Sequence, residues 1–534
     1  MTNEFDLVIR NGRIIDGTGN PYYRADVGFA GGKIRRIAKR IEPSGTRVVL
    51  DAENRVVCPG FVDAHTHDDL YLLSRPTCDD KVLQGVTTVV IGNCGQSVAP
   101  ISDAHRDVIT GSFKFLGSGL NQEDLNIKSF DDYLQKLEGL KPGINVIPLV
   151  GHSTVRMCTM GMANRKPTTT ELKGIQSHVS NAMRDGAFGL STGLIYAPGN
   201  YATTEEIVEL AKMLTPFGGI YATHMRSESE QELDAIVEAI RIGEEAGVHV
   251  HIAHHKIAGK TNWGKSTDTL RLMAEARSRG IEVTCDQYPY RAGSTYLAAV
   301  LPPRVLADGP KVYGSRLRDA AFRAEIVSEI KDANSPGWEN LIKGAGFDGI
   351  MISVSRHSKY VGKTIAEIAD LERKDPFNVI FDLVAEESRE VIAILFMMGD
   401  EDICRIMRNP WTMIGSDGIP GFGINRVHPR MTGTFPRVLG KYVRKEGVLS
   451  LEEAVRKMTS LPAQTFGLKS KGLLKEGFDA DLVVFDPDTI IDCSTYEEPN
   501  RAPEGICNVF VNGQLAAENG RILGAASGQV LRQN

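Results

Sequence analysis

Eight short apolar runs constrain the fold of this chain more than any other feature. Each has the length and composition of a buried β-strand, and amphipathic helical segments separate several of them, as at 204–214, 229–246 and 266–279. This alternation predicts an α/β protein with a (β/α)8 barrel, in which catalytic groups lie at the C-terminal ends of the strands. A doubly wound sheet is the alternative, but no G-x-G-x-x-G motif follows the first run. The runs span residues 56–65, 86–92, 144–151, 187–192, 220–224, 248–254, 281–287 and 411–416.

Both ends of the chain differ from this central pattern. Segments 5–15, 25–38, 480–486 and 509–522 contain short apolar runs, and Asn-Gly or Gly-Gly pairs break several of them. We expect 1–60 and 465–534 to form one small β domain. Two unrelated terminal hairpins are the alternative. Residues 61–464 then form the barrel.

The interval between the seventh and eighth runs, residues 288–410, is too long for a simple barrel loop. We therefore expect an insertion at about 300–400 with helices of its own, a candidate lid over the active site. Elsewhere the sequence has no internal repeat and no low-complexity tract.

Composition and charge exclude several other classes of protein. Hydrophobic residues make up 42% and charged residues 24% of the chain, which is typical of globular proteins and excludes a disordered or fibrous chain. The net charge of −6 favours neither nucleic acid nor acidic membranes as partners, and no apolar run reaches about 18 residues. The first ten residues lack the tracts of a signal peptide, and the eight cysteines lack the spacing of a disulfide framework. We therefore expect a cytoplasmic protein with reduced thiols.

Residues able to bind a metal follow the first two apolar runs. His65 and His67 close the first run, and residues i and i+2 of a strand point the same way, so both imidazoles can reach one ion. Cys94 follows the second run between Asn93 and Gly95. A buried free cysteine is ordinarily a small packing residue, but a thiolate at a strand end is a soft ligand suited to zinc.

Three later runs end in the same way. His224 ends the fifth run and Asp417 follows the eighth. The sixth run contains several histidines, and strand parity does not decide between His254, which we favour, and His255. An Asp-Gly pair such as that at Asp417 commonly forms a turn, but its position after a buried strand favours catalysis. Five strand ends that each carry a His, Cys or Asp predict a metal-dependent active site.

In this order, these residues resemble the N-acyl-D-amino-acid deacylase (D-aminoacylase) family of the amidohydrolase superfamily. The resemblance extends almost from end to end of the chain and implies a distorted TIM barrel with a small β-sandwich built from both termini. The motifs that carry it are PGFVDAHTHDD (59–69), GVTTVV to GNCG (85–95), GHSTVR (151–156), LSTGLIYAPGNYATTEEI (190–207), YATHMRSE (221–228), AHHK (253–256), DQYPYRAGSTYL (286–297), PWTMIGSDG (410–418) and HPRMTGTFPRVLG (428–440).

The resemblance also implies roles for individual residues. One tightly held Zn²⁺ is bound by Cys94, His224 and His254, because the family pattern selects the first histidine of the pair. His65, His67 and Asp417 correspond to a second, weaker metal position. Asp417 is also the general acid and base, and His67 stabilises the oxyanion if the second metal is absent.

The implied substrate is an N-acyl-D-amino acid, a small molecule that is cleaved to a carboxylic acid and a free D-amino acid. Contacts to its carboxylate fall on Lys256, Tyr288 and Ser294, and Tyr196 and Arg430 line the same pocket. The chain departs from the family pattern at Ser153, where glycine is commoner, and in its longer insertion around 305–350.

Two other functions fit parts of the sequence. A cyclic-amide hydrolase of the hydantoinase or dihydroorotase type shares the superfamily barrel, but it normally carries a barrel lysine that LSTGL (190–194) lacks. A non-catalytic protein stabilised by zinc is the second alternative. Structural zinc sites are closed by four protein ligands, whereas three strong ligands beside an aspartate leave an open position.

Overall fold

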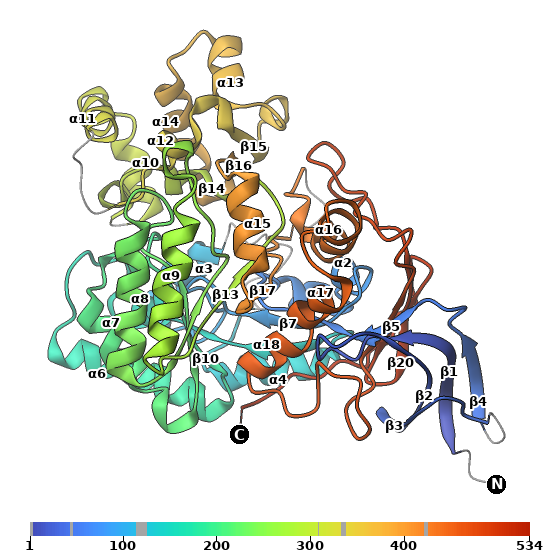
Figure 1. Cartoon of the computed structure of the whole chain (residues 1–534). Helices are drawn as coiled ribbons and strands as arrows, with labels where there is room; N and C mark the ends of the chain where they lie inside the picture. Colours follow the sequence, from blue (N-terminus) through green and yellow to red (C-terminus); the bar gives the residue numbers. More distant parts are fainter. Residues whose placement is uncertain are drawn as a thin grey trace.

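The computed structural model of the chain has a mixed α/β fold (Figure 1). It describes residues 4–42, 46–113, 125–307, 309–332, 338–420 and 426–533. Residues 308 and 333–337 of the predicted insertion lie outside the described residues. No helix in the described part of the chain is long and apolar enough to cross a membrane.

Parallel strands form the centre of the molecule in two sheets. One sheet has the order β6-β7-β8 and the other the order β17-β13-β12-β11-β10-β9. Their strands are buried throughout except at the start of β12, as expected for strands covered on both faces. The strands are β6 (Phe61–Asp63), β7 (Val86–Ile91), β8 (Asn145–Pro148), β9 (Val150–Gly151), β10 (Gly189–Gly193), β11 (Ile220–His224), β12 (His249–Ile252), β13 (Val283–Gln287) and β17 (Thr412–Ile414).

The two sheets are connected through the chain at one end and by hydrogen bonds at the other. Only Leu149 separates β8 from β9, so the chain runs directly from a strand of one sheet into a strand of the other. At the other side, the Ala64 amide donates to the Ile414 carbonyl at 3.3 Å, and the Asp417 amide donates to the His65 carbonyl at 2.7 Å. The strand ends after β6 and β17 are therefore neighbours.

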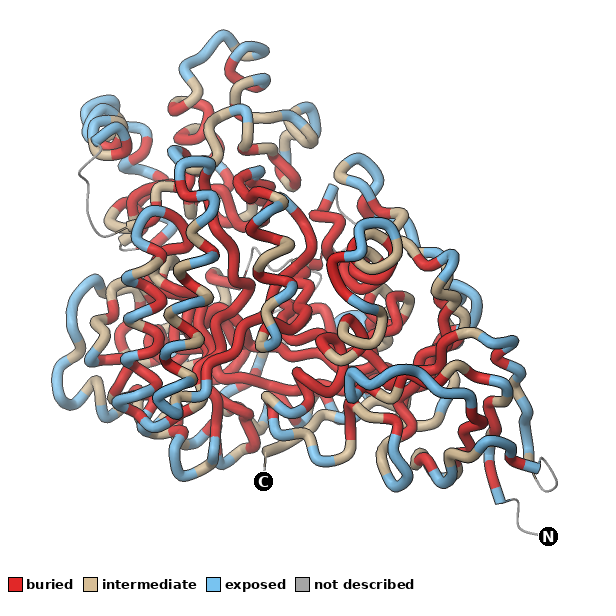
Figure 2. Tube along the Cα trace, in the orientation of Figure 1, coloured by how far each residue is buried: buried red, intermediate tan, exposed pale blue. Residues whose placement is uncertain are grey.

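Helices follow most of these strands and cover the sheet from outside, while the red core of Figure 2 runs along the strands. Several helices begin where a side chain caps the first turn; α6, for example, begins with a capping box between Thr168 and Glu171. The helices outside the insertion are α1 (Tyr71–Ser74), α2 (Asp79–Val82), α3 (Arg106–Ser112), α4 (Phe130–Leu140), α5 (His152–Met160), α6 (Thr169–Asp185), α7 (Thr204–Ala211), α8 (Glu232–Ala246), α9 (Ser266–Ser278), α16 (Arg430–Arg437), α17 (Leu451–Met458) and α18 (Ser460–Thr465).

Both ends of the chain contribute to a single nine-stranded sheet. Within it, β18 from the C-terminal part pairs with β5, and β5 pairs with β1. Phe29 and Phe510 pack in the same apolar core with ring centroids 5.4 Å apart. The strands are β1 (Phe5–Ile14), β2 (Tyr23–Ala30), β3 (Lys33–Ala38), β4 (Thr46–Asp51), β5 (Val56–Pro59), β18 (Leu482–Phe485), β19 (Ile506–Val511), β20 (Gln514–Glu518) and β21 (Arg521–Ile522).

The structure divides the first apolar run, residues 56–65, between two sheets. β5 belongs to the terminal sheet and β6 to a parallel sheet, with Gly60 between them. A Cβ atom at position 60 would lie only 2.1 Å from Thr87 Oγ1, so the close approach of β7 requires glycine here.

The interval 288–410 folds into an antiparallel sheet, β14-β16-β15, with helices around it, at the top of Figure 1. Its elements are β14 (Ala292–Tyr296), α10 (Pro310–Arg316), α11 (Ala320–Lys331), α12 (Leu341–Ala345), β15 (Ile350–Val354), α13 (Ile365–Glu372), α14 (Pro376–Glu387), β16 (Ile392–Phe396) and α15 (Asp400–Arg408).

Candidate metal centre and active site

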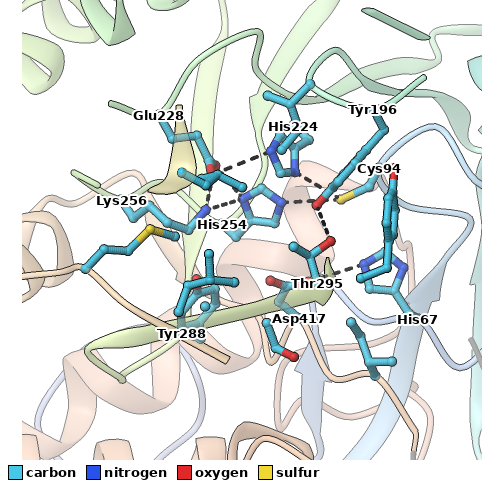
Figure 3. Close-up of a pocket in the computed structure, with 18 of the residues that line it drawn as sticks. His67, Cys94, Tyr196, His224, Glu228, His254, Lys256, Tyr288, Thr295 and Asp417 are labelled. Atoms are coloured by element: carbon cyan, nitrogen blue, oxygen red, sulfur yellow. Dashed lines mark hydrogen bonds and ion pairs between the residues drawn. The ribbon is translucent and has the colours of Figure 1, made fainter. Parts of the chain in front are cut away.

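Three soft or borderline ligand atoms meet at the C-terminal ends of the parallel strands (Figure 3). Cys94 follows β7, His224 ends β11 and His254 follows β12. Cys94 Sγ lies 3.7 Å from His224 Nδ1 and 3.3 Å from His254 Nε2. These ligand atoms all lie within 4.8 Å of one another and all three residues are buried. One sulfur and two imidazole nitrogens at this spacing fit a zinc ion.

His65, His67 and Asp417 lie directly beside this group. Asp417 Oδ1 is 3.2 Å from His67 Nε2 and 3.6 Å from His65 Nε2. His65 Nε2 is also 3.4 Å from Cys94 Sγ, so Cys94 connects its own group to the second one. All six predicted metal-site residues therefore form one buried cluster.

Three residues of the cluster have left-handed backbone conformations. The φ angles are 51° at Cys94, 37° at His254 and 48° at Asp417. Residues other than glycine rarely adopt this region, and such conformations concentrate at functional sites. In each case the left-handed residue follows a strand, where the chain leaves the sheet.

The structure distinguishes the two histidines that strand parity left open. β12 ends at Ile252, so parity no longer describes the residues that follow it. His254 reaches Cys94, whereas His255 Nε2 lies 3.0 Å from Thr269 Oγ1, on the helix α9. His254 is thus the residue in the cluster, in agreement with the sequence prediction.

The surroundings set the protonation states of the cluster. Burial lowers the pKa of His67 to about 4 and also lowers the pKa values of His224 and His254. Burial raises the pKa of the Cys94 thiol well above its ordinary value, so a thiolate here requires a cation beside it. Burial by itself favours a higher pKa for the Asp417 carboxyl group, but the nearby Arg430 guanidinium and His254 outweigh burial. The pKa of Asp417 therefore lies well below its ordinary value. Neutral imidazoles and an ionised carboxylate are the forms that bind metal.

A pocket opens onto the cluster, and Tyr196, Lys256, Tyr288 and Ser294 line it. The Tyr196 ring packs against His224 with centroids 4.9 Å apart, and its hydroxyl accepts a hydrogen bond from Thr295 at 3.2 Å. Lys256 Nζ lies 5.6 Å from the centre of the Tyr288 ring. Four of the five predicted substrate residues therefore border this pocket.

Arg430, the fifth predicted substrate residue, is buried behind Asp417. Its Nη1 lies 2.8 Å from Asp417 Oδ2, and its Nη2 donates to the Ser294 carbonyl at 3.2 Å. The guanidinium carbon also lies 4.6 Å from the centre of the Tyr288 ring. These contacts fix the Asp417 carboxylate and connect it to the insertion.

The insertion supplies the opposite wall of the pocket. Leu341, Leu395 and Met397 give it an apolar surface, and Thr295 and Tyr296 of β14 add hydroxyl groups. The predicted insertion thus contributes residues directly to the site.

Sequence reasoning missed two acidic residues in this centre. Glu228 is buried and its Oε1 lies 2.9 Å from His254 Nδ1; its position four residues after His224 in YATHMRSE was the available signal. Asp286, at the start of DQYPY, lies 3.5 Å from His65 Nδ1 and 2.8 Å from His251 Nε2. Asp286 lies within the strand β13, and Glu228 lies in the loop four residues after the end of β11.

The sequence profile of the amidohydrolase family matches residues 48–517. The chain belongs to the amidohydrolase family. This amidohydrolase is 39% identical over 533 residues to a D-aminoacylase from Alcaligenes xylosoxydans xylosoxydans, which covers 99% of this chain and 97% of the relative. It is 36% identical over 527 residues to an N-acyl-D-aspartate deacylase from the same organism, covering 98% and 95% of the two chains. The family predicted from the motifs is confirmed.

A solved structure extends this likeness to the fold. The amidohydrolase is similar to an N-acyl-D-glutamate deacylase from Bordetella bronchiseptica that was solved with zinc and a phosphonate mimic of the tetrahedral intermediate. The TM-score is 0.81 and the identity 34%, and the match covers 99% of each chain.

Proposed function

We propose that this amidohydrolase uses zinc to hydrolyse N-acyl-D-amino acids to a carboxylic acid and a free D-amino acid. The observation that carries the proposal is the convergence of Cys94, His224 and His254 beside Asp417 at the floor of a pocket. The relatives named as D-aminoacylase and D-amino-acid deacylases support the substrate class.

The proposal includes the finer architecture predicted from the sequence. With β8 and β9 counted as one, the parallel strands are eight, and they close into a (β/α)8 barrel over 61–464; the hydrogen bonds that join the ends of β6 and β17 support this closure. The terminal sheet is part of a small β-sandwich formed by 1–60 and 465–534, supported by the pairing of β5 with β18. All eight cysteines are free thiols, which supports a cytoplasmic location.

Cys94, His224 and His254 hold the tight zinc, and His65, His67 and Asp417 form the weaker position. Their fit rests on the soft thiol of Cys94, on the imidazoles of His67, His224 and His254, whose pKa values burial lowers, and on the ionised carboxylate of Asp417, all buried at ligand spacing. Zinc bound here supplies a Lewis acid that makes water nucleophilic near neutral pH.

Asp417 moves the proton during the reaction. Its carboxylate is ionised and held by Arg430, so it is ready to accept a proton from the attacking water. The same carboxyl group then delivers this proton to the departing nitrogen, so that the amine leaves neutral. His67 Nε2 lies 3.2 Å from Asp417 Oδ1, and if the second metal is absent, the single N–H of the neutral imidazole is the donor to the developing oxyanion.

Lys256, Tyr288 and Ser294 recognise the carboxylate of the substrate. All three border the pocket, and Figure 3 shows Lys256 and Tyr288 on the side of the cluster away from Cys94. Holding the carboxylate fixes which face of the stereocentre meets the water, because the acyl group must still reach the metal cluster. Tyr196 packs against His224. Arg430 orients the Asp417 carboxylate.

Two measurements separate this function from the alternatives. Turnover of N-acetyl-D-methionine, with little turnover of its L-enantiomer or of dihydrouracil, is expected for a D-amino-acid deacylase. Faster hydrolysis of dihydrouracil would favour a cyclic-amide hydrolase instead. A structural zinc protein would unfold when zinc is removed, whereas here we expect turnover to stop while the fold persists.

A further inference from the structure

One buried carboxylate contacts both histidines of the proposed tight zinc site. Glu228 lies in the loop after β11, and its Oε1 is 2.9 Å from His254 Nδ1. Its Oε2 is 3.6 Å from His224 Nε2, which has no hydrogen-bond partner among the described residues. In each histidine, the nitrogen that faces Glu228 is the one that does not face Cys94.

This arrangement determines where the proton of His254 must lie. A metal-bound imidazole nitrogen carries no proton, so binding through Nε2 requires the proton to be on Nδ1. A proton on Nδ1 can be donated to Glu228 Oε1, which accepts it. Glu228 therefore stabilises the metal-binding tautomer of His254, and its other oxygen is the nearest acceptor for His224.

Lys256 favours the opposite tautomer. Its Nζ lies 2.8 Å from the same His254 Nδ1, and an ammonium can only donate, so this contact requires Nδ1 to be bare. The proton would then lie on Nε2 and block the metal-binding nitrogen. Glu228 Oε1 also accepts a hydrogen bond from Lys256, at 2.5 Å, and so offers the ammonium an acceptor other than His254 Nδ1.

We infer that Glu228 is a positioning residue that sets the tautomers of His254 and His224 for zinc, and that it does so against a competing donor, Lys256. The inference rests on the proposed zinc ligands but not on the identity of the substrate. Carboxylates that hold the outer nitrogens of metal-bound histidines typically change metal affinity by about 10- to 100-fold.

The test measures zinc affinity by competition with a chelator, in the wild type and in four variants. Glu228→Ala should bind zinc about 10- to 100-fold more weakly, because Lys256 is left to donate to His254. Lys256→Met alone should bind zinc nearly as well as the wild type. The double variant Glu228→Ala/Lys256→Met should regain at least about threefold of the lost affinity, because the competing donor is gone. Glu228→Gln, whose carbonyl can still accept from Nδ1, should fall between wild type and Glu228→Ala.

Glu206→Ala is the matched control. Glu206 is also a buried carboxylate between a histidine and a cation, with His152 Nε2 at 3.3 Å and Arg156 Nε at 3.1 Å, but it is outside the metal cluster. The Glu206→Ala variant should have a lower thermal stability than the wild type but the same zinc affinity. If Glu228→Ala binds zinc as the wild type does, or if removing Lys256 recovers nothing, the tautomer role is wrong. Because no substrate is used, this outcome is independent of the proposed deacylase activity, and Cys94→Ala checks the ligand set separately.

Discussion

The strand ends and the insertion line the same pocket with different chemistry. The strand ends supply buried ionisable groups, among them Cys94, His224 and Asp417, which short contacts fix to one another. The insertion supplies the apolar side chains of Leu341, Leu395 and Met397 and the hydroxyl groups of Thr295 and Tyr296, but none of the residues of the metal cluster. We infer that the strand ends determine whether the reaction occurs and that the insertion determines which substrate side chain is accepted. Substitutions in the two regions should therefore have different consequences.

The largest effect is expected at Cys94. Cys94→Ala removes the thiolate that both histidines face, so the purified protein should contain well under one zinc per chain and have almost no activity. Metal analysis and a turnover assay measure both. Cys58→Ala, at a buried cysteine of β5, is the control and should retain zinc and activity. Stoichiometric zinc in Cys94→Ala would mean that Cys94 is a packing residue.

The next effect is expected at Asp417. Asp417→Asn retains the shape of the side chain but cannot accept the proton of water, so kcat should fall by at least about 10²-fold. Zinc content should stay near that of the wild type, because the tight ligands are elsewhere. Near-normal turnover would exclude Asp417 from proton transfer.

Lys256 joins the two regions, since it follows β12 and borders the pocket beside Tyr288. Lys256→Met deletes the charge and retains most of the stem, so kcat/KM for an N-acyl-D-amino acid should fall about 10- to 150-fold. A substrate analogue with a carboxamide in place of the carboxylate should lose much less. Equal fractional losses for both substrates would contradict carboxylate recognition by Lys256.

The smallest effect is expected in the insertion, and it should depend on the substrate. Met397→Ala removes apolar surface from the pocket wall, so kcat/KM for N-acetyl-D-leucine should fall about tenfold relative to that for N-acetyl-D-alanine. The zinc content should not change. An equal loss for both substrates would mean that the insertion supports catalysis itself, and the division between the two regions would fail.

The central strands could be predicted from the sequence because strands covered on both faces require apolar runs. Each observed parallel strand lies within one of the eight runs, except that β10 extends one residue beyond its run. Most of the terminal strands overlap the four hairpin segments, but β4 lies outside them and β5 belongs to the first run. The break at Gly60 could not be predicted in the same way. It depends on the approach of Thr87, a contact between segments, and the run itself is continuous in hydrophobicity.

The site was predictable where a ligand directly ends or follows a strand, as at Cys94 and His224. Strand parity could not choose between His254 and His255, because β12 ends at Ile252 and His254 has a left-handed backbone. Here the family resemblance, not the periodicity, selected His254, the histidine whose Nε2 contacts Cys94. Glu228 was missed because it lies in a loop, where neither parity nor a strand end indicates which way a side chain points.

The position of β5 between β1 and β18 has a consequence for biosynthesis. β5 ends at Pro59 and β18 begins at Leu482, so about 420 residues are synthesised between these neighbours. At roughly 5–20 residues per second, this takes about 20–80 s on the ribosome. Throughout that time the edge of β5 that faces β18 lacks its partner, directly before the segment that carries His65 and His67. Its length of four residues keeps this unpaired edge short, which limits the opportunity for another chain to pair with it.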